Sequence, residues 1–148
     1  MDWHELTYAL LGNDPGNLPQ SSALEMVMGN TTFMLEHDEA RERFCCLGVI
    51  SSVSRPESLH PDGMLAVLKA NMDLHAAGMG TLSYDRLECE IVWKKEWPQN
   101  NLHPHVLRET LQQIDELRGD LNRALSMKRH RSGPQDSLDL LLSDLSSP

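Results

Sequence analysis

Residues 59–85 read LHPDGMLAVLKANMDLHAAGMGTLSYD, and this stretch decides the fold. It predicts an apolar helix that ends at Gly78-Met79-Gly80 and is followed at once by a strand over residues 81–84. The helix is apolar on more than one side, and such a helix usually buries two surfaces. We expect one surface to pack on the chain's own sheet and the other on a second copy of the chain, giving a homodimer. The residues expected at the dimer interface are Met64, Leu65, Leu68, Met72 and His75.

The segments around this helix predict an α+β fold. Alternating or β-branched runs predict strands, Gly and Pro clusters mark the loops, and a leucine stripe from Leu107 to Leu125 predicts the last helix. The order is α-β-β-β-α-β-β-α, a twisted antiparallel sheet of five strands carrying three helices. The expected ranges are a first helix ending at Gly12, strands over 23–28, 32–36, 43–53, 81–84 and 87–93, and a last helix opening at Pro104.

Composition and charge exclude several classes of partner. A formal net charge of −9 argues against nucleic acid and anionic membranes, because binding those needs clustered Lys and Arg. No apolar run approaches the roughly 20 residues of a membrane span, and the N-terminal sequence MDWHELTYALLG predicts no secretory signal. The cysteines number three, and Cys45 and Cys46 are adjacent, so a reducing cytosol is expected.

The helix–glycine–strand junction and the order of the elements resemble the class I type III secretion chaperones, over residues 1–127. The resemblance matches Met64, Leu65, Leu68 and Met72 to the family's dimer helix, and Gly78 and Gly80 to its small-residue turn. It implies a homodimer in the bacterial cytosol that binds the N-terminal segment of a secreted effector and keeps it soluble and secretion-competent. A secretion-system ATPase or regulator is a further candidate partner. The loop over residues 13–22 departs from the family's usual Leu-Pro entry, apart from Leu18-Pro19.

A cargo surface is expected on the first helix and the first hairpin. Methionine packs adaptably, and promiscuous binding surfaces often use it. Ordinary core filling is the alternative for any single methionine. The expected cargo-binding residues are Trp3, Leu6, Leu10, Met26, Met28 and Met34.

Two other functions stay open. One is a regulatory adaptor of the same fold that sequesters another secretion-system protein, and the other is a small enzyme that pairs His75 with Asp73 or Asp85. No nucleotide-binding or hydrolase motif occurs in the chain, and His103-Pro104-His105 has no further ligand at zinc spacing. Cys45, Cys46 and Cys89 fall in predicted strands, where a buried thiol is inert. We therefore expect no enzymatic activity, no cofactor and no metal.

Residues 132–148 are predicted to form a flexible acidic tail behind an α+β domain of residues 1–131. The tail DSLDLLLSDLSSP mixes leucines with aspartates after a Ser-Gly-Pro linker. It fits an amphipathic ligand for another protein, a flap over the chain's own binding surface, or a final turn packed on its own domain. The leucines singled out are Leu138, Leu141, Leu142 and Leu145.

Overall fold

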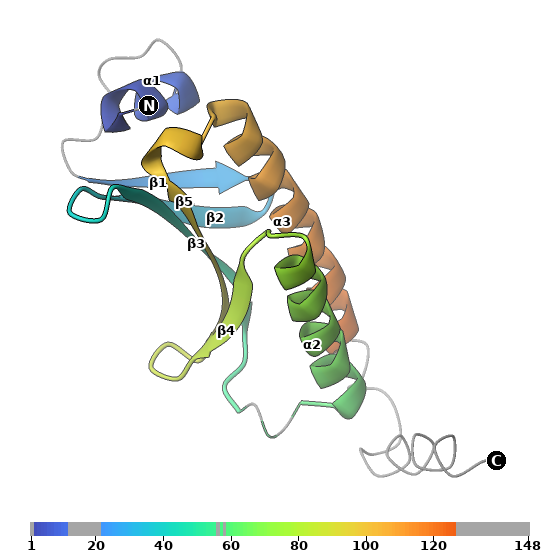
Figure 1. Cartoon of the computed structure of the whole chain (residues 1–148). Coiled ribbons are helices and arrows are strands. Elements are labelled where there is room, and N and C mark those ends of the chain that lie inside the picture. Colours follow the sequence, from blue (N-terminus) through green and yellow to red (C-terminus); the bar gives the residue numbers. More distant parts are fainter. Residues whose placement is uncertain (1, 12–21, 56, 58, 127–148) are drawn as a thin grey trace.

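The computed structural model describes residues 2–11, 22–55, 57 and 59–126 and confirms the predicted order of elements. The strands form one antiparallel sheet in the order β1-β2-β3-β5-β4 (Figure 1). The predictions for residues 132–148 lie outside the described residues. The elements are α1 (Trp3–Leu11), β1 (Ala23–Met28), β2 (Thr31–Asp38), β3 (Arg43–Ser52), α2 (Pro61–Ala76), β4 (Thr81–Asp85), β5 (Glu90–Pro98), the short 3-10 helix η3 (Gln99–Asn101) and α3 (Pro104–Ser126).

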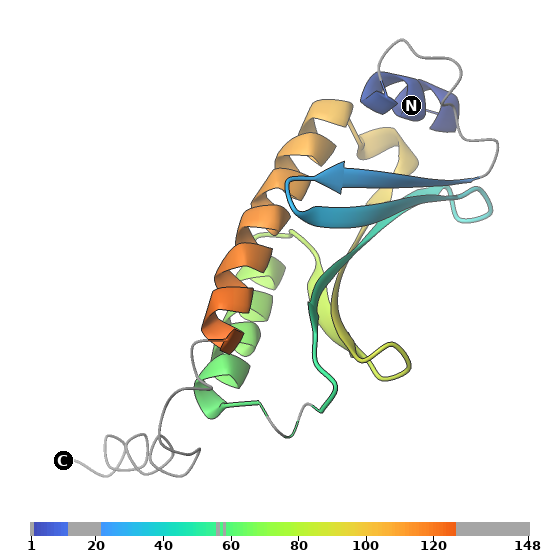
Figure 2. The same ribbon diagram turned by 180° about the vertical axis from the view of Figure 1, so that it is seen from behind.

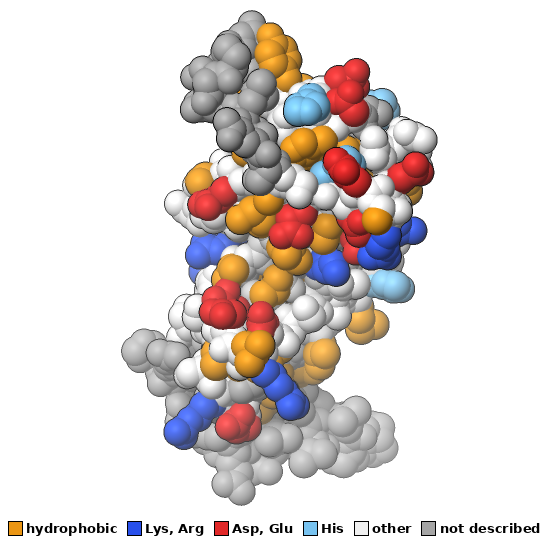
Figure 3. Space-filling view, turned by 90° about the vertical axis from the view of Figure 1, so that its left-hand side faces the viewer, with side chains coloured by type: hydrophobic (Ala, Val, Ile, Leu, Met, Phe, Trp, Pro, Cys, Tyr) orange, Lys and Arg blue, Asp and Glu red, His pale blue; other side chains and the backbone are white. Residues whose placement is uncertain are grey.

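The helices lie on one side of the sheet. α2 and α3 run side by side in two opposite views, and α1 sits at the end of the sheet near the start of α3 (Figures 1 and 2). No described helix covers the opposite face, which we call the outer face. Seen from that side, hydrophobic side chains are exposed between acidic and basic ones (Figure 3). The sheet is therefore buried on one face only.

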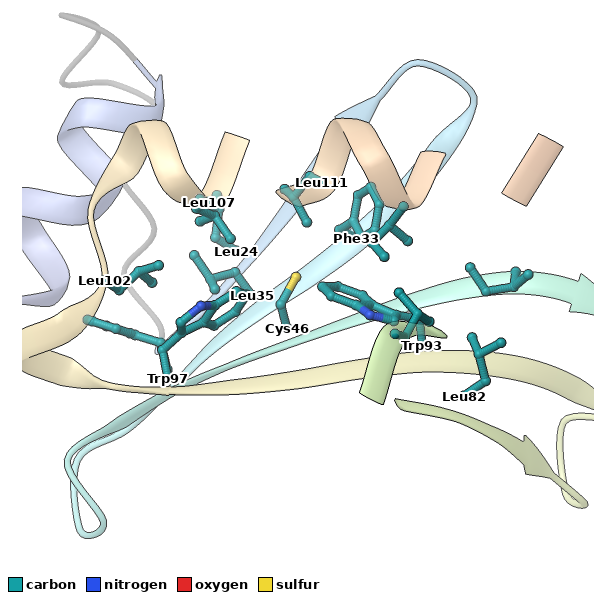
Figure 4. Close-up of a cluster of buried hydrophobic side chains, with 14 of the residues drawn as sticks. Leu24, Phe33, Leu35, Cys46, Leu82, Trp93, Trp97, Leu102, Leu107 and Leu111 are labelled. Atoms are coloured by element: carbon teal, nitrogen blue, oxygen red, sulfur yellow. The ribbon is translucent and has the colours of Figure 1, made fainter. Parts of the chain in front are cut away.

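The core lies between the inner face of the sheet and α3. Side chains alternate along a strand, so every second residue points inward. Leu107 and Leu111 of α3 point toward the sheet, with Leu111 above Cys46 and beside the ring of Phe33 (Figure 4). Phe33 and Trp93 meet edge to face, with ring centroids 5.8 Å apart and planes at 85°. This packing joins β2 to β5 across the intervening strand β3.

The middle helix begins and ends as its sequence predicts. Its first turn holds Pro61, which lacks the N–H that a helix start leaves unpaired, and the His60 ring accepts the Asp62 N–H at 3.1 Å. The chain leaves the helix through Gly78 and Gly80, both with left-handed backbone (φ 66° and 97°).

Two hydrogen bonds fix the chain that follows α2. The indole N–H of Trp93 donates to the Met79 carbonyl at 2.8 Å, and the Asn71 side chain accepts the Leu82 N–H at 2.9 Å. The end of α2 is thereby tied both to the interior strand β5 and to the edge strand β4.

The second hairpin differs from its prediction. The sequence predicts a strand over residues 87–93, but β5 begins at Glu90, and the turn before it contains Cys89 in left-handed backbone (φ 56°). The Asp85 carboxylate explains the longer turn, because it accepts hydrogen bonds from the N–H groups of Leu87 and Glu88. These two groups therefore do not donate to the neighbouring strand. Cys89 is consequently a turn residue and not a strand residue.

Strands β2 and β5 also run further than predicted. β2 continues through Asp38, where the sequence predicts a turn from His37 onward. β5 continues to Pro98, which brings Trp97 into the core beside the first helix. The His37 ring contacts the rings of Trp3 and Phe44, and Trp97 is buried, so both extra strand ends bury aromatic surface.

Replacing Gly80 by alanine should destabilise the fold more than replacing Gly78. Both glycines have positive φ, which costs alanine about 1 kcal/mol. A Cβ on Gly80 would also lie 2.4 Å from the Lys94 carbonyl and 2.8 Å from the Trp93 Nε1, whereas one on Gly78 meets nothing within 4 Å. Chemical denaturation should show Gly80→Ala losing about 1–3 kcal/mol more than Gly78→Ala, the usual cost of overpacking. Equal losses would contradict the close approach at Gly80.

Candidate protein-binding surfaces

The outward side of α2 carries a row of exposed apolar side chains that no other described element covers. Small side chains, among them Ala70, face inward, and Gly63 lets α2 approach the end of α3 because a Cβ there would lie 3.1 Å from Leu125 Cδ2. The five residues expected at a dimer interface all point outward. Their exposed fractions are 45% for Met64, 48% for Leu65, 57% for Leu68 and 72% for Met72, and His75 is exposed as well.

An apolar groove continues this side toward the sheet. It holds about 220 Å³ between α2 and the edge strand β4, with Leu82 and Tyr84 on its sheet side and Val67 and Leu68 on its helix side. The Tyr84 hydroxyl donates to the Val53 carbonyl at 2.7 Å, which holds its ring against the groove. The exposed apolar residues of α2, here called the stripe, and the groove beside them together form one surface, here called the α2 surface.

A second surface lies on the outer face of the sheet. A trough of about 510 Å³ runs there, and Figure 3 shows hydrophobic side chains exposed on that side of the molecule. Its floor is apolar, and Val49 is 43% exposed although it lies on a central strand. The floor side chains are Thr32, Met34, Leu47, Val49 and Val92, and the charged residues that line the trough are Glu25, Asp85, Glu88, Glu90 and Arg118.

The other half of the outer face is polar. The Glu96 carboxylate lies 3.9 Å from Arg41, 3.4 Å from Arg43 and 3.5 Å from Lys94. Exposed pairs of this kind add little to stability, typically about 0–1 kcal/mol each. They compensate the charge of Glu96, whereas Glu36 and Glu39, which line a pocket with it, form no ion pair among the described residues.

The structure does not gather the predicted cargo residues on one surface. Trp3 and Leu6 are buried in the core, so neither side chain is available to a partner. Trp3 stacks on the His37 ring at 5.8 Å and packs beside Phe44. α1 turns one face, with Trp3, Leu6 and Thr7, toward the core, which explains the difference.

The remaining predicted cargo residues are divided by the sheet. Met26 and Met28 lie on the inner face of β1, half-buried against the core, and Leu10 is half-buried on α1. Met34 alone lies in the outer trough. Sequence reasoning did not single out Leu47, Val49 and Val92 as binding residues. The signal was present, because β3 carries apolar residues on both of its faces, which predicts that both faces are covered.

No family model and no curated protein matches the sequence. A chain of the HopA1–SchA chaperone–effector complex superposes with a TM-score of 0.60 at 16% identity, covering 82% of this chain and 90% of that one. A chain of the ExsC–ExsE complex gives 0.59 at 16% identity over 84% and 97%. A chain of the ExoT–SpcS complex from Pseudomonas aeruginosa gives 0.53 at 12% identity over 79% and 91%.

The chain has the type III secretion chaperone fold. This confirms the fold that the sequence resemblance predicts, including the helix–glycine–strand junction at its centre. The superpositions cover most of both chains, so the match is to the whole α+β domain and not to a single motif.

In this chaperone fold the predicted histidine and carboxylate pairs do not form a site. Asp73 and His75 are two residues apart on α2, and side chains at that spacing do not face each other. Asp85 lies at the far end of β4, where it holds the hairpin turn. His103 and His105 stack at 5.8 Å, but the described part of the chain contains no group of three metal-ligating side chains. The described residues also include no helix long and apolar enough to cross a membrane.

The thiols of β3 are poor nucleophiles. Burial raises the pKa of Cys46 to about 12, with a smaller contribution from the neighbouring Cys45. Burial also raises the pKa of Cys45, against a partial opposing effect of Lys94. A raised pKa leaves the thiol protonated at neutral pH, and the thiolate is the reactive form.

Native Cys46 should therefore resist alkylation. With iodoacetamide at pH 8, tandem mass spectrometry should find Cys46 unmodified in the folded chain and fully modified after unfolding in denaturant. Raising the pH toward 12 should increase labelling as the thiolate forms. Rapid labelling of native Cys46 at pH 8 would contradict its burial.

Proposed function

We propose that this protein is a non-enzymatic type III secretion chaperone of the bacterial cytosol, which binds the N-terminal segment of an effector and keeps it soluble and secretion-competent. The observation that carries the proposal is that the described residues leave two separate apolar surfaces exposed, the α2 surface and the outer trough. Exposed apolar surface of this extent marks protein interaction. The HopA1–SchA neighbour, a chaperone–effector complex, supports it.

We assign the α2 surface to a second copy of the chain. The stripe repeats at helical spacing from Met64 through Leu68 to Met72, so it can pack against the same stripe in a two-fold arrangement. A symmetric interface of this kind needs only one self-complementary patch. The outer face of each protomer stays free, because it lies on the side of the sheet away from α2 (Figure 1).

The outer face is then assigned to the effector. An extended segment can place alternate side chains on the apolar floor of the trough. Val27 on the edge strand β1 is 69% exposed, which adds apolar area on the same sheet. Binding of this type needs no ATP, since the segment is held locally unfolded by contacts alone.

Disrupting the stripe should break the dimer. Wild-type protein should scatter light as a particle of about twice the 16.7 kDa chain mass, and Leu68→Asp should shift it toward the chain mass, because a buried unpaired carboxylate opposes association. Leu87→Asp is the matched control, since Leu87 is 94% exposed on the β4–β5 hairpin and away from α2. A wild-type protein that remains monomeric at high micromolar concentration would overturn the assignment.

Charging the floor of the trough should release the effector. Tagged protein purified from its host should bring down an effector, and Met34→Asp with Val49→Asp should weaken that capture by more than about tenfold, the loss typical of central interface residues. Gln112→Asp with Gln113→Asp adds the same charge on the exposed side of α3 and should leave capture unchanged. Full capture by the Met34/Val49 variant at unchanged dimer mass would place the effector elsewhere.

A further inference from the structure

The rims of the outer trough are acidic on both sides. Glu25 lies on β1 at one side, and Glu88 and Glu90 lie on the β4–β5 hairpin at the other, next to Asp85. The Asp85 carboxylate is engaged by two N–H groups of its own turn. Among the described residues, Glu25, Glu88 and Glu90 form no ion pair, in contrast to Glu96, which has three cationic neighbours on the same face. The carboxylates of the trough are thus left for a partner to compensate.

Arg118 of α3 is the one cation among the described residues that line the trough, against four carboxylates. The trough is therefore short of positive charge at its rims.

The spacing of the rims sets the length of the segment that fits. Glu25 on β1 and Glu90 on β5 are separated by three strand-to-strand steps across the sheet. Glu90 is also displaced by four residues along the strand direction from the residue of β5 that lies level with Glu25. With strands about 4.8 Å apart and about 3.3 Å per residue, the two carboxylates are separated by about 20 Å, which about six extended residues span.

From these observations we propose that the trough selects an extended effector segment of about six residues, apolar at alternate positions and flanked on both sides by lysine or arginine. The apolar side chains cover Met34, Leu47 and Val49, and the flanking cations lie against Glu25 on one rim and Glu88 and Glu90 on the other. This inference rests on the proposed function and gives the chemistry of the segment that the outer face binds.

Peptide titrations followed by NMR on the full-length protein test this selection. The first probe has a core of alternating Val and Thr, about six residues long, between pairs of lysines, and the second replaces the lysines with glutamates. The lysine peptide should bind about fivefold or more tighter at low salt, and the difference should shrink as salt screens the rims. Shifted resonances should include those of Glu25, Thr32 and Val92.

A charge reversal on one rim separates this selection from general acidity. Glu88→Lys with Glu90→Lys should abolish or invert the preference between the two peptides. Glu109→Lys with Glu116→Lys makes the same change of net charge on the exposed side of α3 and should preserve it. Circular dichroism should show both variants folded, since all four side chains lie on exposed or half-exposed positions.

The outcomes distinguish this inference from the proposed function. Equal binding of the two peptides by the wild-type protein would overturn the inference, and so would a preference that survives Glu88→Lys with Glu90→Lys. In either case an effector that still co-purifies with the wild-type chain leaves the chaperone function standing. A wild-type chain that captures no effector from its host overturns the proposed function instead.

Discussion

The contacts of one indole ring orient the surfaces of this protein. Trp93 is fully buried on β5, meets the edge of Phe33 from β2, and donates its N–H to the Met79 carbonyl at the end of α2. Two glycines make room for these contacts. A Cβ on Gly48 would lie 2.7 Å from the Phe33 ring, and one on Gly80 would lie 2.8 Å from the Trp93 Nε1. Because the end of α2 is fixed to the interior strand β5, the direction in which α2 turns its exposed stripe is fixed as well.

The same packing explains why two apolar surfaces remain. One layer of helices covers one face of the sheet, and the described residues form no second layer on the other. α2 packs Gly63, Ala70 and Leu74 against its neighbours and leaves Met64, Leu65, Leu68 and Met72 exposed. Exposed apolar area of this kind is typical of surfaces that bind another protein, which is why the proposed function assigns a partner to each of the two surfaces.

The sequence predicted the order of elements because its strongest signals are local. Helical stripes, strand alternation and the Gly78-Met79-Gly80 stop depend on neighbouring residues, and all are confirmed. The prediction failed where one side chain, or a contact between residues far apart in the sequence, determines the local structure. The Asp85 carboxylate lengthens the second hairpin, and tertiary packing buries Trp3 and Leu6, which the pattern placed on a cargo surface. The apolar outward side of β3 was legible in the sequence, but only the fold shows that Leu47 and Val49 lie together with Met34 and Val92.

The central claim is that self-association and effector binding use opposite sides of one rigid core. Hydrogen–deuterium exchange of the wild-type dimer, with and without the N-terminal segment of its effector, tests this claim most directly. We predict that the segment slows exchange in β1 and in the β4–β5 hairpin at residues 85–90, while exchange in α2 stays as it is in the dimer alone. Protection confined to α2, with no change in β1 or the hairpin, would contradict the account.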